Sequence, residues 1–520
     1  MTRTMFSFIS IANAPLALLA ILLCWLSFSS TSVSAAEISW DVGLTAQRNL
    51  ISAHGVIQDE NAPTILYLTG LEGPSQYSTR LNSLLESYGQ TFSADSTTDS
   101  EVNVIVIGNA NPDSETLQFP PTGAAYSENS VSHVLWRWIG AHAPDLIVLE
   151  DGQDFGFREA LADTGIAGFG NIPIERLSAN NSDVQFLQSN SNLVRSEAGV
   201  ELDRRTARSA TAMAEQLATI YGYDFTTPAY VPGMSVIGRL RLGDVDGVNV
   251  LLSPYLRGES IEVSNSSVMA GQLVFAEHAR LTGSEVSRNL VLQAANLAFD
   301  DNGEPLDVMP MHYEMSDSFF MATPLLVKAG VLSGEEKYFD MAIRHVSYMR
   351  NLLLRDNKLY RHSPDADVAW SRGNGFPAYG LALSLSEFPK THPARDLMLG
   401  FLVDHLEALL PYQDADGMWH EVIDHPGSFA EITSTAMIGM AIKRGLDNGW
   451  LAEAIYRPVL DKAWNGIKIR TSFDGVFINA CTSTGKMPSL DDYLGRLAIF
   501  DQDDRAGGMV MNFAIDMAGL

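Results

Sequence analysis

Residues 203–520 consist almost entirely of helix-forming segments that follow one another in pairs, and this pattern restricts the fold more than any other feature. Apolar residues recur there with helical spacing, and turns rich in Gly, Pro and Asp separate the segments. The pattern predicts helices over 204–221, 267–281, 284–299, 317–331, 335–354, 374–387, 393–410, 430–445, 451–466 and 507–519. Such pairs are typical of helical hairpins around a common axis, although periodicity alone fits a toroid, a solenoid or a bundle.

The preceding part of the chain, residues 37–200, alternates short β-rich runs with helical ones. Buried strands are predicted over 64–69, 102–107 and 145–150, with helices over 77–88 and 129–140. This alternation indicates a separate α/β domain with a mostly parallel sheet. The polar stretch 178–196 is predicted to link it to the helical domain, residues 201–520.

Residues 1–36 have the layout of a secretory signal peptide. Arg3 supplies the positive start, 15–28 form a short apolar run, and 33–36 offer small residues for cleavage. No later stretch is long and apolar enough to span a bilayer. We therefore expect an exported protein, periplasmic or secreted, without a membrane partner after cleavage. The sequence does not indicate an oligomeric state.

The charge balance restricts the ligands. The chain has 34 basic and 62 acidic residues and a net charge of −28, which argues against a nucleic-acid partner. The same charge repels anionic polysaccharides at long range. A site for a sugar acid must therefore be locally cationic, so that individual Arg and His residues become informative.

Asp317 is the first candidate catalytic residue. It stands where a helix is predicted to begin, directly before the apolar residues 319–321. Asp is a common helix N-cap, and taken alone the position favours that structural role. Alternatively, a carboxyl group pressed against aromatic rings is partly desolvated and can carry a proton near neutral pH.

Two further segments carry candidate binding residues. Residues 360–376 combine His362, Trp370 and Arg372 with a Gly-Asn-Gly turn. Arg372 could bind a carboxylate through two parallel N–H bonds, Trp370 could stack on a sugar ring, and His362 could bind hydroxyl groups. Trp419, in the segment 413–421, could line the site from another loop, while Glu431 starts a predicted helix and suits a cap.

The order of these motifs resembles the unsaturated glucuronyl and rhamnogalacturonyl hydrolases of glycoside hydrolase families 88 and 105, more closely the latter. The matching segments, within about residues 260–520, are Met-Ser-Asp-Ser-Phe-Phe-Met at 315–321, Trp-Ser-Arg-Gly-Asn-Gly-Phe at 370–376, Glu-Ile-Thr-Ser-Thr-Ala at 431–436, Ser-Thr-Gly at 483–485 and the glycine-rich 503–509. The segment 370–375 is the most specific of them.

The resemblance implies an (α/α)6 barrel of six helical hairpins and a hydrolase that needs no metal or organic cofactor. Its substrates would be oligosaccharides that end in a 4,5-unsaturated uronic acid. Asp317 would donate a proton to C4, and water activated by the same group would add at C5. Arg372 and His362 would hold the unsaturated sugar, with Trp370 as its stacking platform.

Three departures from the family pattern affect this expectation. An aspartate expected one hairpin upstream is absent from 264–271, where Asn265 or Ser266 could replace it. Met315 stands where the family has Trp. The first barrel hairpin is not evident between 224 and 261, where 248–252 suggests a strand, so that about ten helices are predicted instead of twelve.

The N-terminal part, residues 40–200, faintly resembles a zinc carboxypeptidase-like α/β domain. The family's His-x-x-Glu zinc motif is replaced by Thr-Gly-Leu-Glu at 69–72. Without the histidine, we expect no zinc and no peptidase activity. A binding or scaffolding role is the remaining expectation for this domain.

Two other functions remain open. An ordinary glycosidase on the same barrel would need a second carboxylate, supplied by Glu431 or Asp367, about 5 Å from the first if retaining or about 6.5–9.5 Å if inverting. A catalytically inactive carbohydrate-binding or scaffold protein would instead explain the missing upstream aspartate.

Overall fold

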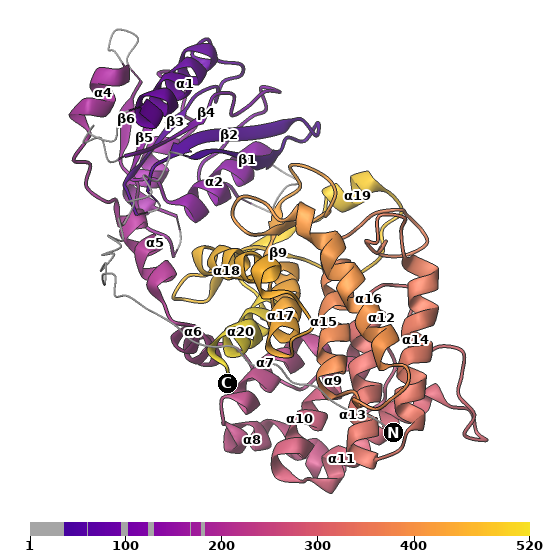
Figure 1. Cartoon of the computed structure of the whole chain (residues 1–520). Coiled ribbons are helices and arrows are strands. Elements are labelled where there is room, and N and C mark those ends of the chain that lie inside the picture. Colours follow the sequence, from indigo (N-terminus) through magenta and orange to yellow (C-terminus); the bar gives the residue numbers. More distant parts are fainter. Residues whose placement is uncertain (1–35, 60, 95–101, 123–128, 167, 178–182) are drawn as a thin grey trace, which may run out of the picture.

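The computed structural model describes residues 36–59, 61–94, 102–122, 129–166, 168–177 and 183–520 (Figure 1). Apart from Ala36, which begins the first strand, the predicted signal peptide lies outside these residues. Within the described ranges, none of the helices has the length and apolar character that crossing a bilayer requires.

The first part of the chain forms one six-stranded sheet. Its strands are β1 (Ala36–Leu44), β2 (Leu50–Ile57), β3 (Thr64–Leu68), β4 (Asn103–Ile107), β5 (Leu146–Leu149) and β6 (Ile174–Arg176), in the order β1-β2-β4-β3-β5-β6. The strands β4, β3, β5 and β6 run parallel, while β1 and β2 add an antiparallel edge. The three predicted strands are therefore confirmed.

Helices cover both faces of this sheet. Leucines of α1 (Ser78–Ala94) pack on one face with Val104 and Val106, and α2 (Ser130–His142) packs on the other face with Ile105 and Ile107. The short helices are α3 (Phe157–Glu159), a π-helix (Ala160–Thr164) and α4 (Asp183–Ser189). The helix α4 falls inside 178–196, so the stretch predicted to link the two parts is partly helical, and its linking role stays a prediction. The Arg80 Nε–Asp183 Oδ2 bond of 2.6 Å ties α4 to α1.

The rest of the chain is mainly helical. Its helices are α5 (Glu197–Ala207), α6 (Ala210–Ala218), α7 (Tyr230–Arg241), α8 (Val245–Leu256), α9 (Ser266–Gly271), α10 (Leu273–Thr282), α11 (Glu285–Ala295), a 3₁₀ turn (Asn296–Ala298), α12 (Ser318–Met321), α13 (Thr323–Ser333), α14 (Lys337–Leu353), α15 (Arg372–Glu387), α16 (Arg395–Leu409), a 3₁₀ turn (Leu410–Tyr412), α17 (Ile432–Asp447), α18 (Glu453–Ile469), α19 (Leu490–Leu494) and α20 (Asp504–Ala518).

These helices close into a barrel. In the continuously described range 183–520, α7, α10, α13, α15, α17 and α20 form an inner ring, each packed on the next, and α20 returns to α7. The helices α6, α8, α11, α14, α16 and α18 lie outside them. The helices approach closely where glycines leave room. A Cβ on Gly380 of α15, for example, would lie 2.4 Å from the carbonyl oxygen of Phe319.

Two sequence predictions about this barrel are wrong. The expected helix 204–221 is interrupted at Arg208, which is extended, and Ser209 caps the new helix α6. The first hairpin, which the sequence did not reveal, is α7 and α8. The run 248–252, taken for a strand, lies in α8, where Val248 and Leu252 share one buried face and Asp244 caps the start. Tertiary burial here overrides the strand propensity of a β-branched run.

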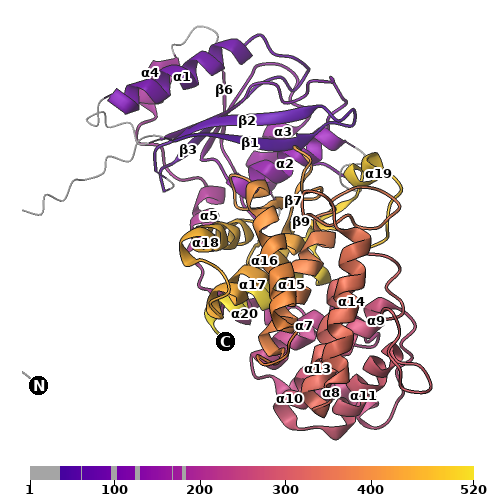
Figure 2. The ribbon, with the colours of Figure 1, turned by 45° about the vertical axis from the view of Figure 1, so that its right-hand side comes forward.

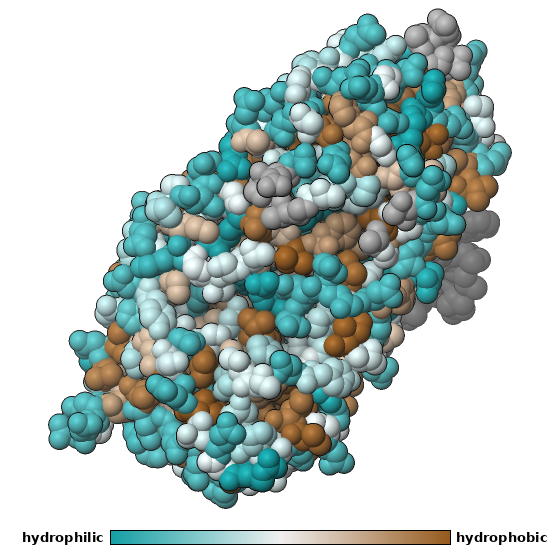
Figure 3. All heavy atoms as spheres, turned by 180° about the vertical axis from the view of Figure 1, so that it is seen from behind, coloured by the Kyte–Doolittle hydropathy of each residue, from teal (hydrophilic) through white to brown (hydrophobic). Residues whose placement is uncertain are grey.

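The sheet covers one end of the barrel (Figure 2). Near this end lie β7 (Trp419–His420), β8 (Ala430–Glu431), β9 (Val476–Cys481) and β10 (Ala498–Gln502). Ile478 of β9 packs into the core between the sheet and α2, and Leu44 of β1 packs into the barrel core. On the face opposite to that of Figure 1, hydrophilic residues predominate and apolar ones lie in scattered patches (Figure 3), in keeping with the high net charge.

Candidate active site

Asp317 does not act as a helix cap. It is the residue before α12, yet its side chain makes no capping bond there. Only 2% of Asp317 is exposed, and its Oδ2 lies 3.1 Å from Nε2 of His362. The following residues Phe319 and Phe320 are fully buried in the barrel core. The carboxyl group is therefore directed to a buried histidine and not to the start of α12.

The glycines and Asn374 of the Gly-Asn-Gly turn explain how the loop 360–376 keeps its shape. Asn374 Nδ2 donates to the carbonyls of Tyr360 and Trp370 at 2.9 and 2.8 Å, and its Oδ1 accepts from the Tyr360 N–H at 2.9 Å. A Cβ on Gly373 would lie 2.8 Å from Ser316 Oγ. This side chain and this glycine therefore hold the loop against the segment that carries the catalytic candidate.

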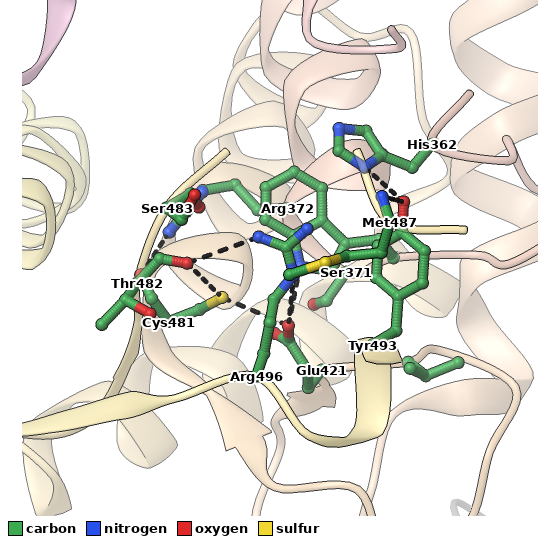
Figure 4. Close-up of polar contacts among 12 residues, drawn as sticks. His362, Ser371, Arg372, Glu421, Cys481, Thr482, Ser483, Met487, Tyr493 and Arg496 are labelled. Carbon is green, nitrogen blue, oxygen red and sulfur yellow. Dashed lines mark hydrogen bonds and ion pairs between the residues drawn. The ribbon is translucent and has the colours of Figure 1, made fainter. Parts of the chain in front are cut away.

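His362 connects Asp317 to a tyrosine that the sequence analysis left without a role. Its Nδ1 lies 2.7 Å from the hydroxyl of Tyr493, which also accepts from the Met487 N–H at 3.1 Å (Figure 4). Burial lowers the pKa of His362, while the charge of Asp317 opposes this shift. A neutral imidazole donates from one nitrogen and accepts at the other. The chain Asp317–His362–Tyr493 can therefore adjust to either protonation state of the aspartate.

Two buried arginines lie beside this chain. Arg372 Nη1 donates to the carbonyl of Cys481 at 2.9 Å, and its Nη2 bonds the carbonyl of Ser483. Arg496 bonds the carbonyl of Gly485 in the same segment. Both guanidinium groups therefore hold backbone oxygens of 481–485, the segment that leaves β9.

The arrangement of Trp370 differs from the prediction of an open stacking platform. Its ring is fully buried and lies under the guanidinium carbons of Arg372 and Arg496, at 4.9 and 4.6 Å from the centroid. The His362 ring is 4.3 Å away. These contacts leave no face of the indole for a sugar, because charged and aromatic side chains already cover it. In this conformation Trp370 orients the cations.

Glu421 is a buried carboxyl group that the sequence analysis missed. Its Oε1 accepts from Trp370 Nε1 at 2.8 Å and from Cys481 Sγ at 3.2 Å, and Arg496 Nε lies 3.8 Å away. No described residue bonds its Oε2. Burial raises the pKa of Glu421 to about 8, with the charge of Glu431 adding to the shift and Arg496 opposing it. Glu421 is therefore expected to be largely protonated at neutral pH.

The carboxylates considered for an ordinary glycosidase have structural roles. Glu431 caps α17 by accepting from the Ser434 N–H at 2.6 Å, and it also accepts from the Cys481 N–H at 2.9 Å. Asp367 is exposed at the surface and pairs with Arg355. Neither side chain is bonded to Asp317 or to His362.

Trp419 and Asn265 make hydrogen bonds other than those expected of site residues. Trp419 is buried, and its Nε1 donates to the carbonyl of Leu409 at the end of α16. This bond supports the core, so the structure gives no support to a role in substrate binding. Asn265, considered as a substitute for the missing aspartate, caps α9 by accepting from the Val268 N–H at 3.0 Å. It is bonded neither to Asp317 nor to His362.

Tyr230 from α7 is a further buried group that the sequence analysis missed. Burial raises its pKa to about 12, and the charges of Arg372 and Asp317 both act on its hydroxyl. That hydroxyl has no hydrogen-bond partner among the described residues. Because α7 belongs to the hairpin that the sequence did not reveal, no motif could have indicated this residue.

Comparison with known proteins places these residues in a family context. The model of Glycosyl Hydrolase Family 88 matches residues 309–520, which include Asp317, His362, Trp370 and Arg372. The resemblance of the helical part to families 88 and 105 is confirmed. A solved glycoside hydrolase of family 105 from C. acetobutylicum ATCC 824 superimposes with a TM-score of 0.52 and 20% identity, covering 60% of this chain and 99% of that one. This likeness supports the barrel fold.

Two curated relatives have related names. The unsaturated rhamnogalacturonyl hydrolase YesR of Bacillus subtilis (strain 168) is 27% identical over 186 residues, which are 34% of this chain and 52% of the relative. The unsaturated 3S-rhamnoglycuronyl hydrolase of Alteromonas sp. (strain LOR) is 25% identical over 185 residues, 33% of this chain and 45% of the relative. The match thus spans about half the length of these curated relatives.

In the N-terminal part, Thr-Gly-Leu-Glu at 69–72 stands where the carboxypeptidase-like family has its zinc motif. Thr69, in place of the histidine, donates its hydroxyl to the carbonyl of Gly108 at 2.9 Å. The described residues contain no group of three His, Cys, Asp or Glu side chains placed to hold a metal ion. The carboxypeptidase-like resemblance itself and the domain boundary near residue 200 stay predictions.

Proposed function

We propose that the protein is a hydrolase that removes the terminal 4,5-unsaturated uronic acid from oligosaccharides released by polysaccharide lyases. The names of the two curated relatives support this class of substrate. The observation that carries the proposal is the bond between Asp317 and His362 beside the buried cations Arg372 and Arg496. An exported location, suggested by residues 1–36, would bring the enzyme to such products.

Asp317 would serve as both acid and base. Its carboxyl group donates a proton to C4 of the vinyl ether, and the positive charge that develops at C5 is attacked by water. The resulting carboxylate takes a proton from that water, so the group ends as it began. The hemiketal opens by cleavage of the C5–O5 bond, which leaves a ketone at C5 and a hemiacetal at C1. Collapse of this hemiacetal to an aldehyde then breaks the glycosidic bond and releases the remaining sugar as an alcohol. Hydration of an activated alkene needs little more than one well-placed acid–base group.

The two arginines would hold the sugar's carboxylate. Their guanidinium groups now bond the carbonyl oxygens of Ser483 and Gly485, and these oxygens stand in for the oxygens of a carboxylate. The carboxylate of a substrate would replace these carbonyl oxygens as the acceptor of the guanidinium N–H bonds. It is the stronger acceptor because it carries a full negative charge. Since Asp317 is 2% exposed, entry requires residues 483–485 to move away from the arginines.

The proposed function is tested on a panel of lyase-digested polysaccharides with the full chain. We expect the ultraviolet absorbance of the conjugated double bond to disappear with at least one digest, while saturated oligosaccharides of the same polysaccharides remain intact. Hydrolysis of the saturated series alone would assign the protein to the ordinary glycosidases. Binding of unsaturated products without loss of the absorbance would identify it as a carbohydrate-binding protein.

Replacement of Tyr493 by phenylalanine should lower kcat about fivefold with little change in KM. The variant removes the one partner that His362 Nδ1 has among the described residues, at a cost of about 1 kcal/mol for the lost bond, but keeps the ring under the Arg496 guanidinium group. Steady-state kinetics on an unsaturated oligosaccharide measure the effect. Tyr456→Phe, on the outer helix α18, is the control and should behave like the parent. If Tyr493→Phe had the same kcat as the parent, the bond from Tyr493 to His362 would not contribute to catalysis.

A further inference from the structure

A second cavity lies where the N-terminal sheet meets the barrel. It encloses about 1130 Å³ of empty space, part of it open to solvent. Trp40 of β1 and Trp138 of α2 line it from the sheet side, and the segment 411–430 lines it from the barrel side. In Figure 2, β1 and α2 lie directly over this end of the barrel, near β7 and β9. We call this space the junction cavity.

Aromatic side chains form a large part of its wall. The rings of Trp40 and Trp138 meet edge to face at 6.1 Å, and Trp138 stacks on His142 at 3.7 Å. Trp40 is half-buried, as is Tyr412 on the barrel side. The indole N–H of Trp138, a residue only 7% exposed, has no acceptor among the described residues. An apolar wall with an unused buried donor is typical of a pocket for a ligand with both apolar faces and hydroxyl groups.

The charged groups of the junction cavity already have partners. The bonds are Arg470–Asp416 at 2.6 Å, His142–Asp416 at 3.1 Å, His420–Asp414 at 2.9 Å, Arg355–Asp424 at 2.7 Å, Arg137–Asn479 at 2.9 Å and the Gly427 N–H to Asp41 at 3.2 Å. The lining holds four carboxylates, Asp41, Asp414, Asp416 and Asp424, and two guanidinium groups, Arg137 and Arg470, so its charge balance disfavours a carboxylate ligand. An uncharged ligand fits this lining better than a uronate.

The junction cavity and the candidate active site lie on either side of one loop, residues 420–423. Its lining residue Ile423 donates an N–H bond of 2.9 Å to the carbonyl of Ala369, next to Trp370, and Val422 is bridged to Trp370 itself. His420, also in its wall, precedes Glu421, which accepts from the Trp370 indole. One loop therefore forms a wall of both spaces.

From these observations we infer that the junction cavity binds uncharged sugar units of the oligosaccharide whose unsaturated end reaches Asp317. This inference rests on the proposed function. Trp40 and Tyr412 supply the apolar contacts, and the Trp138 N–H donates to a sugar hydroxyl. The N-terminal part thereby extends the binding site beyond the barrel, which gives the sheet a role in selecting longer substrates.

The test measures binding by isothermal titration of the full chain with neutral tetrasaccharides of rhamnose, xylose and glucose, which have no unsaturated end. At least one should bind, and Trp138→Phe, which removes the N–H donor but keeps an aromatic ring, should weaken that binding about tenfold. Trp40→Phe provides a second variant of the same wall. Trp464→Phe, packed on Phe513 of the barrel, is the matched control and should bind like the parent.

The possible outcomes separate this inference from the catalytic one. Absence of binding by all three tetrasaccharides, or equal binding by the parent and both cavity variants, overturns the junction cavity as a sugar site, even if lyase products are hydrolysed. Binding that is lost in the cavity variants but retained in Asp317→Asn supports it. If such binding occurs and no lyase product is consumed, the hydrolase proposal fails and the sugar site stands.

Discussion

Replacing Asp317 by asparagine should reduce turnover of unsaturated oligosaccharides by about 10²- to 10⁴-fold, the range that general acid–base catalysis typically contributes. The amide has the shape of the carboxyl group and can still bond His362, which now lies 3.1 Å from Oδ2. It cannot donate a proton to C4 or take one from water. The loss should therefore appear in kcat, with a thermal unfolding midpoint close to that of the parent.

Asp367→Asn is the matched control for this variant. Asp367 is exposed, pairs with Arg355 and is the other aspartate considered as a catalytic carboxylate. Parental turnover in Asp367→Asn together with the loss in Asp317→Asn would place the acid–base role at one residue, as the hydration mechanism requires. Equal losses in the two variants would favour a two-carboxylate glycosidase. Full activity of Asp317→Asn would refute the assignment of the acid–base group.

The sequence predicted the site best where a motif must keep a fixed local shape. The Gly-Asn-Gly turn was recognisable because Asn374 bonds two carbonyls of its own loop, while Gly373 has no room for a side chain. Asp317 and His362, the chemical centre of the proposed function, are bonded to each other across 45 residues. Their positions in separate motifs could be read from the sequence, whereas the bond between them could not.

The parts that the sequence did not reveal depend on long-range packing. Val248 and Leu252 form one buried face of a helix only because α7 and the barrel core lie beside it, so a local reading favoured a strand. Tyr493 and Arg496 reach the site from the segment after β9, through bonds to His362 and Gly485. Neither residue has a sequence neighbour that would indicate such a bond.

Glu421 is the clearest case of a role created by burial, and it should make the stability of the protein depend on pH. Its pKa rises from the ordinary 4.5 to about 8 in the folded protein. Between these values the folded state keeps a proton that the unfolded state has lost. The protonated Glu421 should therefore contribute its full stabilisation below about pH 4.5. As the pH rises from there to about 8, the free energy of unfolding should fall by about 1 kcal/mol per pH unit.

Glu421→Gln should remove this slope, because the amide keeps an oxygen for the Trp370 N–H and has no proton to lose. Urea unfolding at pH 5 and pH 8 gives the free energy of unfolding of both proteins. The difference in how that free energy changes with pH isolates Glu421 from all other titrating residues. The variant should be the more stable protein at pH 8, by a margin that shrinks toward pH 5. Glu407→Gln, on an exposed position of α16, should follow the parent at both values. If the free energy of unfolding changed equally with pH in Glu421→Gln and in the parent, Glu421 would already be ionised in the folded state. The charge of Arg496 would then outweigh the effect of burial.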